Sequence, residues 1–263
     1  MLPETFWGRI QYLLQQYGAS FLSGAGNTMI IAIVGTFLGC LIGFIVGIIQ
    51  TIPVDKRDSD VKKTLVGFLK FIMACYVEFF RGTPMMAQAM FIYYGMLPLL
   101  GLNLSMWQAA YFILSINTGA YMAETVRGGI NSIDPGQTEG AKAIGMTHVQ
   151  TMMSVILPQA FRNIIPQIGN NFIINIKDTA VLSVISVTDL FFVHKSVAGA
   201  LYTYFASATI VMVIYLIMTV TASQLLRWLE NKLEGDASFD LATTDTLALT
   251  SGMLNYNDKK QKK

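Results

Sequence analysis

Charged and polar side chains stand inside stretches of this sequence that are otherwise apolar, and they are the first candidates for chemistry. Glu78 and Arg81 are three residues apart, so on a helix they can neutralise one another. We interpret them as a structural ion pair near Pro84, which should kink the segment because it lacks an amide hydrogen. Thr83 and Gln88 flank this proline. Because polar groups in a membrane segment are costly, we expect these two to face a ligand.

A second polar group follows one face of a later apolar segment. Gln167, Asn171 and Asn175 are four residues apart, and Asp178 follows three residues later, beside Lys177. These spacings place the stripe on one side of a helix. Buried polar groups need partners or water. Two interpretations stay open: the stripe lines a cavity, or it provides polar contacts between helices across a dimer.

A third group, Asn117, Tyr121 and Glu124, also shares one helix face, and Arg127 follows Glu124 by three residues. We interpret this group mainly as structural. The hypothesis of an intramembrane hydrolase using Glu78, Asp178 or His194 has no support from a paired carboxylate or a nucleophile with its base. The isolated histidines do not predict a metal site.

The composition indicates a protein built for a lipid bilayer. Of 263 residues, 53% are hydrophobic and only 13% are charged, whereas soluble domains carry about 25% charged residues. The net charge of +2 gives no indication of a nucleic-acid partner. We predict an all-α membrane protein with five transmembrane helices at about 27–52, 76–97, 106–126, 150–176 and 206–226.

Three regions follow from this pattern. Residues 1–26 predict an N-terminal interfacial helix, 27–233 the transmembrane domain, and 234–263 a polar, disordered cytoplasmic tail. Lysine and arginine concentrate in the loop 53–63, in 127–162 and after residue 227. Positive charge marks cytoplasmic loops, so the pattern predicts a multi-pass protein with its N-terminus outside and its C-terminus in the cytoplasm.

One polar segment between two apolar ones predicts a short helix at about 134–146, outside the membrane. Asp134 can cap it and Gln137 completes a capping box, while Gly145 is placed to end it. Thr147 and Gln150 repeat the cap and open the next helix.

The same segment carries small residues that let a partner approach closely. They are Gly136, Gly140, Ala141 and Ala143, and Glu139 beside them offers one charged anchor. The run Glu139-Gly140-Ala141, followed by Gly145 and by Val-Ile-Leu-Pro at 155–158, resembles the EAA loop of ABC importer permeases. That family's second position is usually alanine, where this sequence has Gly140. The resemblance implies a coupling helix that docks on a separate ATPase.

Two further motifs resemble the polar amino acid subfamily of these permeases: Arg-Gly-Thr-Pro at 81–84 and Lys-Asp-Thr at 177–179. The resemblance places the second motif at a substrate cavity. There Lys177 would meet the carboxylate of a zwitterionic amino acid and Asp178 its ammonium. The Asn and Gln side chains of the stripe would bind an uncharged polar side chain, so we predict a glutamine-like substrate, with cationic amino acids or cystine as the alternative.

The resemblance as a whole implies the type I ABC importer fold in a bacterial cell membrane. The expected partners are two copies of an ABC ATPase, a second permease as homodimer or heterodimer, and an extracellular or periplasmic substrate-binding protein. This chain would bind no cofactor, because Met146 replaces the lysine of a phosphate loop. ATP and magnesium would bind the partner subunit. A passive channel is a further alternative, but it would not need a docking helix.

Overall fold

The computed structural model describes residues 2–54 and 58–234, and every regular element in this part is a helix. The predicted tail after residue 234 lies outside the described residues. The elements, in order, are α1 Phe6–Thr51, α2 Asp60–Gly82, α3 Met85–Met90, the π-helix η1 Phe91–Met96, α4 Leu97–Leu99, α5 Met106–Asn131, α6 Pro135–Ala143, α7 His148–Thr151, the π-helix η2 Met152–Ile156, α8 Leu157–Asp178, the 3₁₀-helix η3 Thr179–Ile185, α9 Leu190–Leu201 and α10 Tyr204–Glu234.

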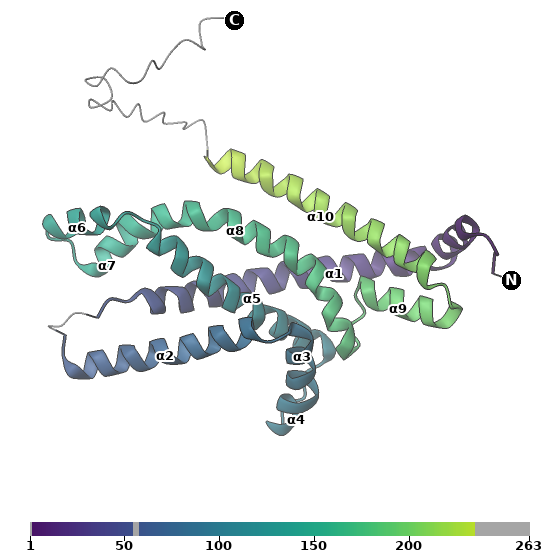
Figure 1. The fold of residues 1–263 in the computed structure, drawn as a ribbon, viewed down its shortest axis with the longest axis horizontal. Helices are drawn as coiled ribbons and strands as arrows, with labels where there is room; N and C mark the ends of the chain where they lie inside the picture. Colours follow the sequence, from purple (N-terminus) through teal and green to yellow (C-terminus); the bar gives the residue numbers. More distant parts are fainter. Residues whose placement is uncertain (1, 55–57, 235–263) are drawn as a thin grey trace, which may run out of the picture.

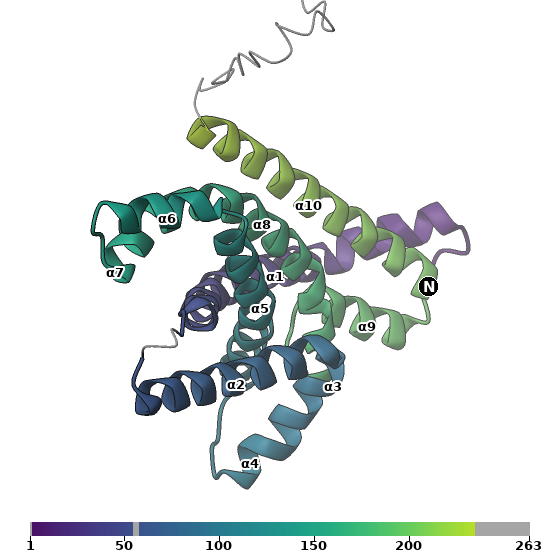
Figure 2. The same cartoon turned by 60° about the vertical axis from the view of Figure 1, so that its left-hand side comes forward.

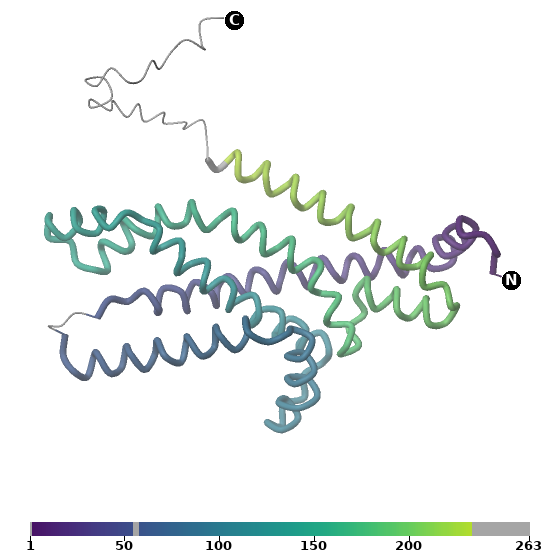
Figure 3. Tube along the Cα trace, in the orientation of Figure 1, coloured from purple at the N-terminus to yellow at the C-terminus, as the bar shows by residue number. Residues whose placement is uncertain are grey.

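The long helices lie side by side and alternate in direction. Following the colours from purple to yellow in Figures 1 and 3, α1, α5 and α10 run one way while α2 and α8 run the other. The short helices α6 and α7 lie at one end of the bundle, where α1 ends and α2 begins. The N-terminus lies at the opposite end (Figure 1).

The centre of the bundle is the seam between α1 and α5. Four glycines of α1, spaced four residues apart, each face a residue of α5. The α5 residues are also spaced four apart. The pairs are Gly35 with Leu114, Gly39 with Thr118, Gly43 with Met122 and Gly47 with Val126. Ridges of this spacing interdigitate when one of them is made of small residues. The glycine repeat therefore serves close helix packing within the chain.

The N-terminal region differs from the prediction of a separate interfacial segment. Residues 6–51 form one helix of 46 residues, with no interruption at residue 26. Thr5 caps this helix by accepting a hydrogen bond from the amide of Gly8 at 3.2 Å. The run holds no proline, and its glycines are tolerated because most of the inner ones pack against neighbouring helices.

The predicted span at 76–97 is wrong as a single helix. Helix α2 ends at Gly82, Thr83 is extended with φ −122° and ψ 149°, and Pro84 starts a new helix. A residue before proline avoids the α-helical region, so the chain turns here instead of kinking. Figure 2 shows α3 and α4 leaving the direction of α2.

By length and apolar composition, two described helices could cross a membrane, α1 and α10. The other predicted spans correspond to α5 and to the continuous run of α7, η2 and α8. The π-helix of η2 directly precedes Pro158, where it accommodates the missing amide hydrogen. The number of five spans stays a prediction.

Candidate functional site

Helix α6 is the predicted short helix, and most of its predicted boundaries are present. Gly145 has φ +85°. Its amide donates to the carbonyl of Lys142 at 3.0 Å, and the next amide, of Met146, donates to Ala141 at 3.1 Å. These two bonds form a Schellman motif, which favours glycine at this position. Thr147 then caps α7.

The capping box predicted at the start of α7 is confirmed, and the one predicted at the start of α6 is wrong. The side chain of Thr147 and that of Gln150 exchange the expected bonds with each other's backbone. At α6, Asp134 instead accepts from the amide of Gly136 at 2.7 Å. The Gln137 amide oxygen accepts from Gln159 Nε2 at 3.5 Å. Gln137 thus connects α6 to α8 and cannot reach back to its own cap.

The residues predicted to contact an ATPase lie on different sides of α6. Ala141 is only 6% exposed, and α6 packs on η2 and α7 of its own chain. Its burial gives no support to a contact with the ATPase, which stays a prediction for this residue. Gly140 has open space around its Cα. Glu139 is exposed and lines a hollow toward the end of α1.

The end of α6 supports a first prediction. Gly145→Ala should lower the stability of the purified permease by about 1 kcal/mol, because an L-residue is strained at φ +85°. Gly140→Ala is the matched control on the same helix: it has free space, so higher helix propensity should raise stability by roughly 0.5–1 kcal/mol. Thermal unfolding in detergent measures both. Equal shifts for the two variants would contradict the assigned helix end.

Thr83 is exposed and Gln88 is buried, and both form hydrogen bonds within the chain, so their contact with a ligand stays a prediction. Gln88 is 3% exposed. Its Nε2 donates to the carbonyls of Phe80 and Thr83 at 2.9 Å each, and its Oε1 accepts from Asn117 Nδ2 at 2.9 Å. Thr83 Oγ1 donates to the carbonyl of Phe79 at 2.8 Å. These groups satisfy the backbone opened by Pro84 and join the break to α5, so they stabilise a turn.

The residues of the polar stripe on α8 do not share one environment in the folded chain. Asn175 is 4% exposed; its Nδ2 donates to Thr36 Oγ1 at 2.7 Å and its Oδ1 accepts from Thr118 Oγ1 at 3.2 Å. It therefore joins α1, α5 and α8 within one chain, whereas the two interpretations of the stripe were a substrate cavity and contacts across a dimer. Asn171 donates to the carbonyl of Gln167 at 3.0 Å.

The two charged residues at the end of α8 lie outside the hollow that Glu139 lines. Lys177 is exposed and Asp178 is partly buried at the last turn of the helix. Gln167, earlier on the same helix, is also exposed. Their role as a substrate site stays a prediction that this conformation does not support.

Arg81 has a different partner from the one predicted. Its Nη1 lies 3.4 Å from Glu124 Oε2 on α5, and the same carboxylate binds Arg127 in a bidentate pair at 2.8 and 3.0 Å. No ion pair joins Glu78 and Arg81 within residues 58–234. Both Glu78–Arg81 and Glu124–Arg127 have the spacing for a pair, and packing of α2 on α5 selects the second.

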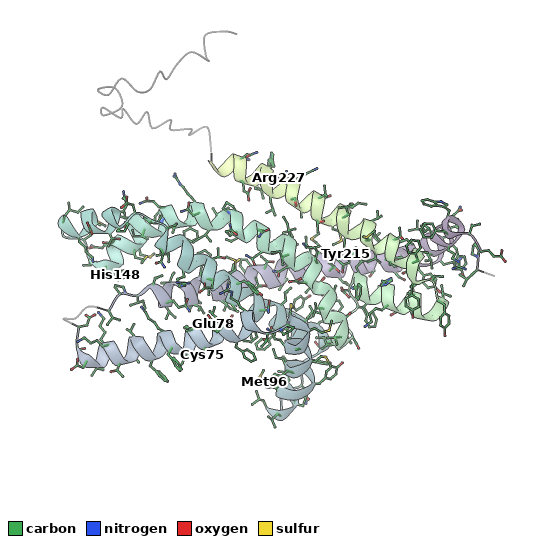
Figure 4. All side chains as sticks on the ribbon, in the orientation of Figure 1. Cys75, Glu78, Met96, His148, Tyr215 and Arg227 are labelled. Atoms are coloured by element: carbon green, nitrogen blue, oxygen red, sulfur yellow. The ribbon has the colours of Figure 1, made fainter. Side chains whose placement is uncertain are left out.

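These charges surround a cavity of about 300 Å³ between α1, α2 and α5, lined by Gln50, Lys70, Ala74, Val77, Glu78, Glu124 and Arg127. Figure 4 places Glu78 on α2 at the middle of the bundle. Gln50 Oε1 is buried there and has no hydrogen-bond partner among the described residues. Neither Gln50 nor Lys70 was predicted as a site residue, although charge within an apolar segment was a usable signal for the lysine.

The family model for inner membrane components of binding-protein-dependent transport systems matches residues 64–235. This chain belongs to that family. The prediction of an ABC importer permease with the type I fold is confirmed by this match together with the relatives and structures below.

Individual relatives and structures agree. The chain is 32% identical to the arginine transport system permease protein ArtQ of Bacillus subtilis, over 82% of this chain and 93% of that one. It is 33% identical to the glutamine transport system permease protein GlnP of Escherichia coli, over 81% and 92%. A crystal structure of an amino acid ABC transporter with histidines matches with 36% identity and TM-score 0.72, over 82% and 95%. An inward-facing methionine ABC transporter, MetNI, shares the fold at 18% identity and TM-score 0.61.

Proposed function

We propose that this permease carries a neutral polar amino acid, glutamine-like in its side chain, through a path that includes the charged cavity between α1, α2 and α5. The relatives named above are permeases for arginine and for glutamine, which supports the amino acid class. The cavity, and not the stripe of α8, is the observation that carries the proposal.

The cavity offers complementary charges for a zwitterion. Lys70 and Arg127 can bind the α-carboxylate, while Glu78 and Glu124 can accept from the ammonium group. With Arg81 at Glu124, the cluster holds three cations and two carboxylates, one positive charge in excess. This excess disfavours a cationic side chain. Gln50, whose Oε1 has no partner among the described residues, lines the same cavity.

The transport cycle would follow from the position of α6. An ATPase binding at α6 would move this helix, and with it α5 and α8, between outward and inward states. A dimer of permeases, two ATPase subunits, which would bind ATP and magnesium, and an external binding protein complete the proposed assembly. The orientation proposed has the N-terminus outside, since α6 and α7 lie at the end of the bundle opposite the N-terminus (Figure 1).

Reconstitution tests this proposal. The permease is co-purified with its ATPase and binding protein and placed in proteoliposomes. We expect ATP-dependent uptake of radiolabelled glutamine, with at least tenfold weaker competition by unlabelled arginine. Selective uptake of arginine would contradict the substrate assignment. Uptake without any ATPase would contradict the coupling mechanism.

A further inference from the structure

Arg81 is a cation at the edge of the charged cavity. It lies in the last turn of α2, one residue before this helix ends at Gly82. Its Nη1 lies 3.4 Å from Glu124 Oε2, and the carboxylate of Glu124 lines the cavity. The Arg81 side chain is 37% exposed and that of Glu124 is 27% exposed. Neither group is sealed inside the protein, so a ligand can reach the pair.

Glu124 holds its two arginines unequally. Arg127 donates from Nε to Oε1 at 3.0 Å and from Nη2 to Oε2 at 2.8 Å, which are the two bonds of a bidentate pair. Both residues belong to α5, so this pair needs no neighbouring helix. Arg81 comes from α2, and its 3.4 Å distance exceeds the roughly 2.7–2.9 Å of a strong charge-assisted bond. Arg81 is therefore the arginine that a competing cation would replace.

A second contact on α5 can retain Arg81 after it leaves Glu124. Its Cζ lies 5.7 Å from the centroid of the Tyr121 ring, within the range of a cation–π contact. Separately, the Tyr76 hydroxyl donates to the carbonyl of Ile116 at 2.6 Å and holds α2 on α5 without either arginine. The guanidinium can therefore move away from the carboxylate while α2 keeps its place.

The group that fits this exchange is the ammonium group of an amino acid. A carboxylate offers about four acceptor positions, and Arg127 takes one on each oxygen of Glu124. An ammonium group has the same charge as a guanidinium but is compact and carries three donors. It can approach Oε2 from the cavity and take the position of Arg81. A ligand without an ammonium group cannot neutralise the carboxylate, so it would leave Arg81 where it is.

We propose that Arg81 is a specificity-determining residue that occupies Glu124 in place of the ammonium group of the substrate and leaves it when the substrate binds. The inference rests on the proposed function, since it concerns the same cavity. The site is competent for an ammonium group only in the fraction of molecules in which Arg81 has left Glu124, and the apparent affinity falls by that fraction. This loss of affinity applies to ligands that bind Glu124 and to no others.

Arg81→Met tests the exchange, because methionine keeps an unbranched side chain and removes the charge and the donors. Arg81→Gln repeats the test with a neutral polar side chain, and Arg81→Lys restores a competing cation. Arg162→Met is the matched control: Arg162 is an exposed arginine of α8 and does not line the cavity. Calorimetry on the permease in nanodiscs measures the binding of L-glutamine and of glutaramic acid, which is glutamine without its α-amino group. L-arginine is compared in the same way with 5-guanidinopentanoic acid, and unfolding temperatures confirm that each variant is folded.

We expect Arg81→Met and Arg81→Gln to bind glutamine about tenfold more tightly than the wild type, because the competing cation is gone. Glutaramic acid should gain nothing in either variant. Arg81→Lys and Arg162→Met should bind glutamine within about threefold of the wild type. A residue with a merely structural role would change the binding of glutamine and of glutaramic acid alike. That result, or weaker binding of glutamine by the folded neutral variants, would overturn the inference.

The two pairs of ligands separate this inference from the proposed function. If arginine binds and shows the expected dependence on Arg81 while glutamine does not bind, the exchange is supported and the substrate assignment fails. If glutamine binds and Arg81→Met changes it no more than Arg162→Met does, the substrate assignment stands and the exchange fails. Absence of binding by both amino acids would contradict both.

Discussion

Gly43→Val is expected to prevent α1 from packing on α5 and to leave little folded permease. A Cβ atom at Gly43 would lie 2.9 Å from the backbone amide of Ala123, closer than real Cβ contacts occur. The backbone of α5 cannot rotate away as a flexible side chain could. We expect a loss of about 3 kcal/mol or more, since overpacking here must separate two helices. Thermal unfolding and the monodisperse fraction in detergent measure the effect.

Gly26→Val provides the control on the same helix. Gly26 is exposed and has nothing within 4 Å of the position of a Cβ. The substitution adds the same β-branched side chain with the same small gain in helix propensity over glycine. The two variants should differ clearly in unfolding temperature. Similar temperatures would contradict the glycine seam as the centre of the fold.

The features that sequence predicted best are those fixed by local chemistry. The α6 end at Gly145 and the cap at Thr147 depend on backbone geometry within a few residues, and both are present. The glycine repeat of α1 also needed no partner to be recognised, because four-residue spacing marks a single helix face. What it could not indicate is that the partner is α5.

The features that sequence predicted poorly depend on which distant residue packs against them in the folded chain. Glu78–Arg81 and Glu124–Arg127 have identical spacing, and only tertiary packing brings Arg81 to Glu124. Asn175 illustrates the same limit. A polar residue on an apolar helix predicts a need for hydrogen bonds, but Thr36 is 139 residues away in sequence. Long-range partners decide whether such a residue binds a substrate or a neighbouring helix.

This distinction moves the candidate substrate site from α8 to α5. In the described structure Asn175 and Gln88 have used their side-chain amides within the chain. Gln50 has an unused buried oxygen, and the charges around it face a cavity. A site that must bind a ligand needs groups the fold leaves incomplete. By that criterion Gln50 is a better candidate than the stripe. Glu124 is already paired with Arg81 and Arg127, so it would have to exchange one arginine for the ammonium group of the substrate.

Glu124→Gln is therefore expected to reduce glutamine uptake about thirtyfold. The change leaves Arg81 and Arg127 without their shared carboxylate. It also removes one of two acceptors for the ammonium group of the substrate. Loss of a partly buried charged partner costs about 2 kcal/mol or more. Uptake is measured in proteoliposomes, and the unfolding temperature of each variant is recorded to separate binding from folding.

Asp60→Asn is the control for removal of an acidic partner. Asp60 pairs with Lys63 at 3.3 Å, but its side chain is almost fully exposed, and exposed pairs contribute little. This variant should transport at the wild-type rate. If Glu124→Gln folds normally and its uptake stays within twofold of wild type, Glu124 serves only to orient Arg127 and the exit of α5 toward α6. In that case Glu124 does not bind the ammonium group of the zwitterion. The substrate would then bind elsewhere, because Glu124 is the carboxylate of this cavity that two arginines hold in place in the described part of the chain.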